Sequence, residues 1–312
     1  MQIKKCPNCG FSKIIKKGKR KGLQRYKCKS CGYNFSSKRR KISKTDTIFE
    51  DYFYHRQILS ELSKKYDKSI PWIKKQLELY EVKYKKDNPR KIVLVIDVTF
   101  FGKRKDKTGV MVFKDSLSKK IIKWKFVKTE NLSDYKELFC EVLESGYEIQ
   151  AIVLDGKRGL IKAFNEYPIQ MCIFHQQQIM TRYLTQNPRH KASIDLKEIS
   201  HLLGKINEIE FLKLLNQWYK TYKLFLDEKV YDLNTKKKYF IHKRLRSAYR
   251  SLKINLPYLF TFQRFKERKI PTTTNSLDGG IFSPLKTLIR IHRGIKPEMR
   301  QKLINDFLSR KS

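Results

Sequence analysis

The chain has 312 residues, of which 40% are hydrophobic and 12% aromatic, a composition typical of a globular protein with a sizeable core. Its charge is unusual, because 70 lysines and arginines stand against 30 aspartates and glutamates and give a net charge of +40. This excess indicates a polyanionic partner, most commonly nucleic acid, although a lysine-rich genome bias would act in the same direction. No segment resembles a signal peptide or has the ~20 apolar residues of a membrane span, so we expect a cytoplasmic protein without membrane contact.

Four of the six cysteines form two close pairs near the N-terminus, Cys6-x-x-Cys9 and Cys28-x-x-Cys31. A glycine follows each pair and lets the chain turn, so that both thiolates can face one ion. The basic segment between the pairs has the pattern of a hairpin, and residues 1–40 are predicted to form a zinc ribbon with a structural Zn²⁺ site. The alternatives are two disulfides or a redox-active pair, which a cytoplasmic location disfavours.

The N-terminal segment is also strongly basic. Residues 1–45 contain 16 lysines and arginines and no acidic residue. Such a run can be a solvated surface, but an unbroken basic ribbon is more typical of a segment that follows DNA phosphates. The candidate DNA contacts here are Lys16, Lys17, Lys19, Arg20, Arg25, Arg39 and Arg40.

Residues 41–88 contain two helical patterns separated by a polar break. Ser69 is the predicted N-cap of the second helix, and Pro71 falls in its first turn, where a missing N–H does no harm. Two short helices joined by a tight turn fit a helix-turn-helix DNA-binding domain, in which Lys74 and Lys75 face DNA. A plain helical hairpin is the alternative.

The pattern changes to strands from residue 89 onward. Apolar runs predict strands at 91–102, 108–115, 119–130, 148–159 and 168–175, with helices at 131–146 and 160–167. This order is that of an RNase H-like fold, so the predicted fold class is α/β with a mixed five-stranded sheet. Residues 89–178 form the first part of this core, an all-α insertion follows at 179–268, and residues 269–312 complete the core.

Two aspartates occur where these apolar runs are interrupted or end. Asp97 lies inside the first strand and Asp155 follows the apolar part of the fourth, and these two strands are neighbours in the RNase H-like fold. Two carboxylates side by side need cations, and their hard oxygen ligands suit Mg²⁺ or Mn²⁺. A pair of such ions can act on a phosphodiester. Alternatively, each aspartate is a separate strand-end residue whose carboxylate is satisfied by lysine or backbone.

A third acid, Asp278, follows the insertion in the stretch TTTNSLDGGIFSPLK. With the later His292-Arg293-Gly294, this stretch is similar to the TTN-x-x-E-G stretch of Mutator-type (MULE superfamily) transposases of bacterial insertion sequences. Cys172-x-x-His175 resembles the Cys- or Asp-x-x-His motif that this family carries after its second aspartate. The resemblance covers about residues 90–300. The zinc ribbon and the helix-turn-helix resemble the DNA-binding ends of several insertion-sequence transposases, which is less specific.

The resemblance implies a transposase that binds the terminal inverted repeats of an insertion sequence and catalyses metal-dependent strand cleavage and strand transfer. Its DDE triad would be Asp97, Asp155 and Asp278, which would hold Mg²⁺ or Mn²⁺, and double-stranded DNA and a second copy of the chain would be its partners. The family's last acid is Glu, whereas this chain has Asp278. An inactive, transposase-derived DNA-binding regulator is therefore an alternative, and an RNase H-like nuclease or resolvase is another.

Other residues have several interpretations. The resemblance implies that His175 supports catalysis, whereas Cys172 and His175 could also be packed at a strand end or form a zinc pair. His292 and Arg293 would either contact phosphate or lie at a solvated helix end. Trp218 and its neighbour Tyr219 are expected in the core of the helical insertion rather than stacked on a base.

Overall fold

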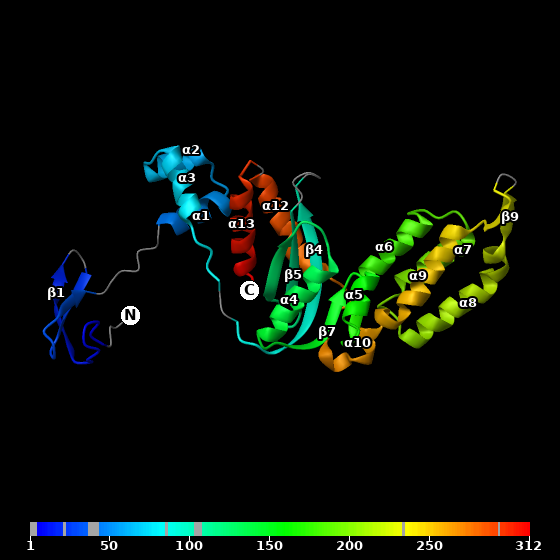
Figure 1. Cartoon of the computed structure of the whole chain (residues 1–312), viewed down its shortest axis with the longest axis horizontal. Helices are drawn as coiled ribbons and strands as arrows, with labels where there is room; N and C mark the ends of the chain where they lie inside the picture. The colour runs from blue at the N-terminus through cyan, green and yellow to red at the C-terminus, as the bar shows by residue number, and fades with distance from the viewer. Residues whose placement is uncertain are drawn as a thin grey trace. The chain divides into compact units, whose positions relative to one another are not determined.

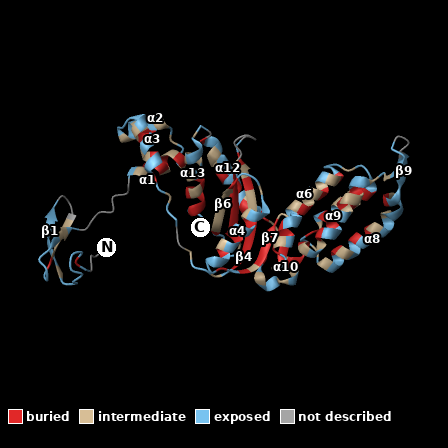
Figure 2. Cartoon of the chain, viewed as in Figure 1, coloured by how far each residue is buried: buried red, intermediate tan, exposed pale blue. Residues whose placement is uncertain are grey.

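The computed structural model describes residues 5–20, 23–36, 44–84, 87–102, 108–232, 235–292 and 294–312. The chain divides into two compact units, Met1–Tyr80 and Glu81–Ser312, whose elements are drawn in Figure 1. Buried side chains are concentrated in the helices and in the large sheet, whereas most residues of the N-terminal ribbon are exposed (Figure 2). No helix in the described ranges is long and apolar enough to cross a lipid bilayer.

The N-terminal ribbon is a small antiparallel sheet of β1 (Ile14–Arg20), β2 (Leu23–Cys28) and β3 (Asn34–Ser36), in the order β1-β2-β3. The predicted hairpin is therefore confirmed. Cys6 and Cys28 are the buried residues among those from 5 to 36 whose burial is described. A sheet with so little apolar core needs another source of stability, and the cysteines are placed to supply one.

Three helices complete the first unit, α1 (Lys44–Phe53), α2 (Leu59–Tyr66) and α3 (Ile70–Leu79). Phe49 packs against Tyr80 with 3.7 Å between ring centroids, and Leu62 and Ile73 are fully buried. Ser69 is the N-cap of α3 in position, as predicted, but its side chain makes no capping hydrogen bond. The sequence predicts two helices in this region, and α1 is the additional one.

Asp51 of α1 forms a buried polar junction with the end of α2. Its carboxylate accepts hydrogen bonds from Lys65 Nζ at 2.7 Å and Tyr66 Oη at 2.6 Å, and it contacts His55 Nδ1 at 3.0 Å. Burial alone would raise the pKa of Asp51, but these three partners outweigh it and lower the pKa to about 2. The ionised form of Asp51 therefore links α1 to α2.

The second unit contains a mixed five-stranded sheet with the order β6-β5-β4-β7-β8. Its strands are β4 (Lys91–Phe101), β5 (Thr108–Asp115), β6 (Ile121–Val127), β7 (Glu148–Leu154) and β8 (Ile169–Met171). The three strands β4, β5 and β6 pair antiparallel, whereas β4 with β7 and β7 with β8 pair parallel. The predicted mixed sheet is confirmed. The prediction of a fifth strand at 168–175 is wrong beyond Met171, because a helix begins at Ile173.

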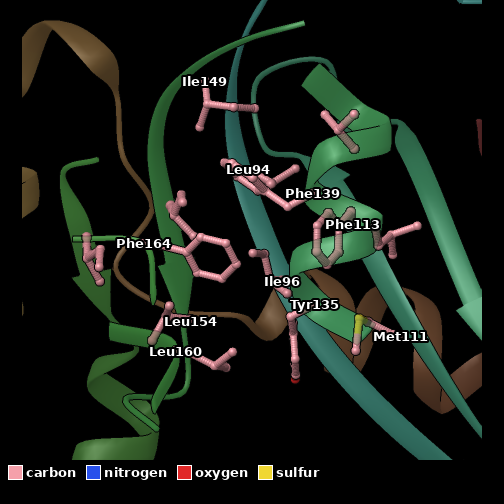
Figure 3. Packing of buried hydrophobic residues seen from close by; sticks show 14 of the residues in the cluster. Leu94, Ile96, Met111, Phe113, Tyr135, Phe139, Ile149, Leu154, Leu160 and Phe164 are labelled. Atoms are coloured by element: carbon pink, nitrogen blue, oxygen red, sulfur yellow. The ribbon is translucent and has the colours of Figure 1, made fainter. Parts of the chain in front are cut away.

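One face of this sheet is covered by α4 (Leu132–Glu144), which packs on alternate residues of the central strand. Figure 3 shows Tyr135 and Phe139 of α4 beside Ile96 of β4 and Phe113 of β5. Because side chains alternate along a strand, Asp97 points to the face opposite Ile96.

The helices after β8 form a separate lobe of the second unit. They are α6 (Ile173–Leu184), α7 (Lys191–His201), α8 (Glu208–Asp227), α9 (Lys243–Leu259) and the short α10 (Thr261–Arg264). Trp218 is buried among them and donates from Nε1 to the Ala192 carbonyl at 2.9 Å, which confirms its predicted place in the helix core.

The prediction that this insertion is all-α is wrong. An antiparallel pair, β9 (Lys229–Asp232) and β10 (Lys237–Phe240), connects α8 to α9. Each strand has four residues, which is too short for strand alternation to emerge from a lysine-rich stretch. Cationic side chains stabilise the pair through the Phe240 ring, which lies 3.6 Å from the Arg246 guanidinium and 4.8 Å from Lys229 Nζ.

The C-terminal part of the chain returns to the sheet. It consists of α11 (Asn275–Leu277), a π-helical turn at Asp278–Phe282, α12 (Ser283–Ile291) and α13 (Pro297–Ser309). Trp124 of β6 donates from Nε1 to Asn305 of α13 at 2.8 Å, which ties α13 to the edge of the sheet. Lys114 of β5 is buried and donates from Nζ to the Ser276 carbonyl at 2.9 Å, which fixes the turn that carries Asp278.

Replacing Asp51 with Asn is expected to destabilise the α1–α3 helices by about 1.5–3 kcal/mol at neutral pH, because charge-assisted hydrogen bonds are lost. In the wild type this contribution is fully present above the unfolded pKa of about 4 and is lost as the pH falls towards the folded value of about 2. Hydrogen exchange of amides in residues 44–80 of the full chain measures both effects. Asp67→Asn, at an exposed position with a positive φ that Asn tolerates, is the control; equal exchange in the two variants would contradict the expectation.

Candidate functional site

The four N-terminal cysteines converge on one point. The Sγ atoms of Cys6 and Cys31 lie 3.7 Å apart and those of Cys9 and Cys28 lie 3.6 Å apart. Tetrahedral Zn²⁺ with Zn–S bonds of about 2.3 Å places its sulfurs about 3.8 Å apart, whereas a disulfide needs about 2.05 Å. The sulfur arrangement thus fits a zinc tetrathiolate and not two disulfides.

Two matching backbone turns produce this arrangement. The N–H of Gly10 donates to the Cys6 carbonyl at 2.9 Å, and the N–H of Gly32 donates to the Cys28 carbonyl at 3.1 Å. Both glycines have positive φ, 72° and 70°, which other residues adopt only with strain. In the described part of the chain, these cysteines are the one group of at least three potential ligand residues whose donor atoms all lie within 4.8 Å of one another.

The predicted DNA-contacting cations lie mostly on exposed surface. Lys16, Lys17, Lys19 and Arg20 are exposed on β1, Arg25 is partly exposed on β2, and Lys74 and Lys75 are exposed on α3. The remaining predicted contacts, Arg39, Arg40 and Arg293, lie outside the described residues.

The structure brings the three predicted acids of the second unit towards one another. β4 and β7 are parallel neighbours with Val95 opposite Val153, so Asp97 and Asp155, each two residues further on, leave the pair at the same level. Asp278 is the first residue of the π-helical turn, and α11 immediately before it packs on β4. π-helical turns are rare and frequently occur at functional sites.

The acids act on one another electrostatically. Burial and the charge of Asp278, with a smaller effect of Asp155, raise the pKa of Asp97 to about 7, against the opposing effects of the Val98 N–H and His175. None of the three acids forms a salt bridge with a described lysine or arginine. Three half-buried carboxylates that form no ion pair with a described lysine or arginine are a donor set that a hard divalent cation fits. The carboxylate oxygens of Asp97, Asp155 and Asp278 are less tightly grouped than the sulfurs of the four cysteines.

Cys172 directly follows Met171, the last residue of β8, and is buried as the N-cap of α6, so the alternative of packing at a strand end fits Cys172, whereas His175 lies in the first turn of α6. The buried Cys172 sulfur accepts from the Thr274 backbone N–H at 3.4 Å and from Thr274 Oγ1 at 3.6 Å. Thr274 Oγ1 in turn lies 3.3 Å from Asp278 Oδ2. The Cys172 thiol therefore supports the segment that presents the third acid.

His175 faces the same group of acids. The neighbouring Cys172 thiol and the charges of Asp97 and Asp155 raise its pKa above the usual value, against the effect of burial. Its Nδ1 atom is buried and has no hydrogen-bond partner among the described atoms. His175 is therefore a cationic or proton-donating group beside the carboxylates, and the interpretation of Cys172 and His175 as a zinc pair finds no further ligands in the described ranges.

Several side chains around the three aspartates were not predicted from the sequence. Tyr135 donates to Glu130 Oε1 at 2.9 Å, and Lys157 Nζ lies 3.2 Å from the same oxygen while its backbone N–H donates to Asp155 Oδ1 at 3.0 Å. Thr274 lies in the stretch TTTNSLDGGIFSPLK, but the sequence predicts no role for it. Lys157 and Thr274 share a signal in the sequence, because each lies within four residues of an acid of the site, whereas Tyr135 lies eight residues beyond the end of β6 and has no such signal.

His292, which the sequence placed either against phosphate or at a solvated helix end, is buried at the end of α12. The solvated position is therefore wrong for His292.

The known proteins give little further information. No family model matches the chain, and no curated protein matches it. A chain in the solved structure "Drosophila P element transposase strand transfer complex" is similar in outline, with 11% identity and a TM-score of 0.41 over 88% of this chain and 93% of that chain. At these values the likeness supports no conclusion about the function of this chain.

One zinc ion per chain is expected in protein purified without chelators, and Cys28→Ser is expected to lose most of it because a tetrathiolate site needs all four ligands. Inductively coupled plasma mass spectrometry measures the metal content. Cys140→Ser, at an exposed cysteine of α4, is the matched control and should keep the zinc. Zinc well below one equivalent in the wild type would refute the site.

Gly156→Ala is expected to displace Asp155 and to destabilise the second unit by about 1–3 kcal/mol. Gly156 has φ of +88°, and a Cβ there would meet the Met171 side chain at 2.4 Å. Urea unfolding of the full chain gives the stability. Gly159→Ala, where a Cβ meets nothing within 4 Å and the backbone is helical, is the control and should be neutral or stabilising; the opposite ranking would disprove the close contact.

Proposed function

We propose that the protein is a metal-dependent DNA transposase of the DDE type, with Asp278 in place of the usual Glu. In this proposal the second unit is an RNase H-like core interrupted by the helical lobe, and α2 and α3 of the first unit are a helix-turn-helix beside a zinc ribbon. The resemblance to Mutator-type transposases of bacterial insertion sequences gives the finer assignment, with DNA in a bacterial cytoplasm as the setting.

The observation that carries the proposal is the meeting of Asp97, Asp155 and Asp278 from three separate parts of the chain without a neutralising lysine or arginine. The fold gains no stability from Asp97 at this position, because burial and the neighbouring charges of Asp278 and Asp155 raise its pKa and so disfavour its ionised form. Groups kept at a cost in stability are typical of an active site. The net charge of +40 supports a polyanionic substrate.

In the proposed reaction the three carboxylates hold the ions and define where the scissile phosphate lies. Bound Mg²⁺ or Mn²⁺ would activate the attacking oxygen and stabilise the leaving oxygen of the phosphodiester. His175, beside the carboxylates, can donate a hydrogen bond or a proton to the phosphate, which matches its raised pKa. Thr274 orients Asp278 through its hydroxyl, and Cys172 holds Thr274 in place.

DNA binding is assigned to the first unit. The exposed cations of β1, above all Lys16, Lys17 and Lys19, would follow phosphates, and Lys74 and Lys75 of α3 would lie at a groove. Because two ends of an element have to be joined, we propose a dimer or larger assembly on DNA.

A cleavage and strand-transfer assay tests the proposal on labelled DNA that carries the ends flanking the gene, with Mg²⁺ or Mn²⁺. Asp155→Asn and Asp278→Asn are expected to lower cleavage by about 1,000-fold or more while DNA binding is kept, because each removes an ion ligand and not a DNA contact. Glu166→Gln, at an exposed acid of the same unit, should cleave normally.

Asp278→Glu is the informative additional variant, since it restores the residue that the resembling family carries. Metal-dependent cleavage by the wild type would show an active enzyme. Cleavage by Asp278→Glu alone would show a chain weakened by the shorter acid. Specific binding of the ends without cleavage by either would replace the proposal with an inactive DNA-binding regulator.

A further inference from the structure

The helical lobe contains a cavity at the C-terminal end of α6, whereas the carboxylates lie near the N-terminal end of that helix. It has a volume of about 690 Å³ and lies between the end of α6, the loop at 185–190, the start of α7 and the start of α9. Among its lining residues are Arg189, His190, His242, Lys243 and Arg244, and none of the lining residues is acidic. A cavity with three permanent positive charges and no acid in its wall is selective for anions.

The backbone adds to this positive field. The cavity lies at the N-termini of α7 and α9, and the N-cap residues there are His190 and His242, neither of which caps its helix with its side chain. Neither helix has an acid in its first turn. The backbone N–H groups of Lys243, Arg244 and Leu245 have no acceptor in the described part of the chain. Cationic side chains and unsatisfied N–H groups thus line the same cavity, and phosphate oxygens accept hydrogen bonds from both.

Aromatic packing makes the wall rigid. The His242 ring stacks on Phe225 at 3.7 Å and its Nε2 atom contacts Glu228 at 3.0 Å, while the His190 ring lies 5.7 Å from that of His242. Arg244 donates to the Arg182 carbonyl, which fixes one side of the cavity. Arg189 and Lys243 are both exposed, so both charged groups are accessible to a ligand, although Lys243 Nζ also lies 4.2 Å above the Tyr239 ring.

The positive charge extends beyond the cavity. Residues 227–246 contain seven lysines and arginines and three acidic residues, of which Asp227 pairs with Arg246 and Glu228 with His242, and residues 182–191 contain three lysines and arginines and no acid. Lys236, Lys237 and Lys238 are exposed on or beside β10. A small free phosphate would need only the cavity, whereas a charged surface that continues over a hairpin matches a polymer of phosphates.

We propose that this end of the helical lobe is a second DNA-binding surface, which contacts the phosphate backbone of duplex DNA at the cavity between 183–193 and 241–245. This surface is separate from the basic residues of the first unit and from the carboxylates. It deepens the proposed function, on which it rests, by giving the helical lobe the task of holding DNA outside the catalytic centre. The contacts are to phosphates and carry no base specificity.

The salt dependence of DNA affinity tests the surface. Arg189→Gln/Lys243→Gln is expected to bind a fluorescent 30-base-pair duplex about 10-fold or more weakly and to lower the slope of log K against log[salt] by about 2, since each phosphate contact contributes about 0.9. Lys220→Gln/Lys223→Gln removes two exposed charges from α8 in the same lobe and is the control. Every protein in the test carries Asp155→Asn, so cleavage does not enter.

Hydrogen exchange locates the contact directly. Protection of amides in 185–193 and 241–246 on addition of duplex DNA, abolished by the double variant and absent with inorganic phosphate or a mononucleotide, supports the proposal. Equal salt slopes in the two double variants, protection by inorganic phosphate or mononucleotide alone, or protection by single-stranded RNA and not by duplex DNA would each overturn it. DNA protection of this surface together with no end cleavage by the chain that keeps Asp155 would refute only the transposase assignment.

Discussion

The parallel pairing of β4 with β7 is the constraint on which the candidate site depends. It sets Asp97 and Asp155 at the same level on adjacent strands, and every other group of the site is arranged around that pair. Parallel neighbours need a crossover, which here contains β5, β6 and α4, and α4 then covers the opposite face with Tyr135 and Phe139. Strand pairing therefore sets the spacing of Asp97 and Asp155, and the buried core on the other face holds the two strands in place.

The third acid depends on contacts that are distant in sequence. Lys114 reaches the Ser276 carbonyl across 162 residues, and Cys172 reaches Thr274 across 102 residues. Both contacts close the long excursion through the helical lobe and return the chain to the sheet. The lobe can therefore be large without loosening the site, because its two ends are fastened beside each other at β8 and α11.

Much of the sheet was predictable because its strands are long and apolar. The predicted bounds of β5 agree with the structure, and those of β4 differ by one residue, since Ile92–Ile96 and Val110–Phe113 are buried runs that only a covered sheet accommodates. The cysteine site was predictable from spacing alone. The end of β8 was not, because Cys172-Ile173-Phe174 is as apolar as the strand before it, and the backbone hydrogen bond from Ile173 to Thr272, which turns the chain away, is invisible in the sequence.

The hairpin β9–β10 and the cavity beside it were missed for related reasons. Four-residue strands leave no periodic signal, and the basic residues at 182–191 and 229–246 lie far apart in sequence, so that only packing of α6 against α9 and α7 shows them as one surface. Thr274 and Gly156 act through contacts with Asp278 and Met171, which spacing along the chain does not reveal.

One consequence concerns α6, which begins beside the carboxylates at Ile173 and ends at the basic cavity at Leu184. Its 12 residues form a rod of about 18 Å, since an α-helix rises about 1.5 Å per residue. Duplex DNA makes one turn in about 34 Å, so this rod spans about half a turn. A duplex lying along α6 would turn its major groove towards one end of the helix and its minor groove towards the other. The length of one helix would then set which groove faces the cavity once the other groove faces the carboxylates.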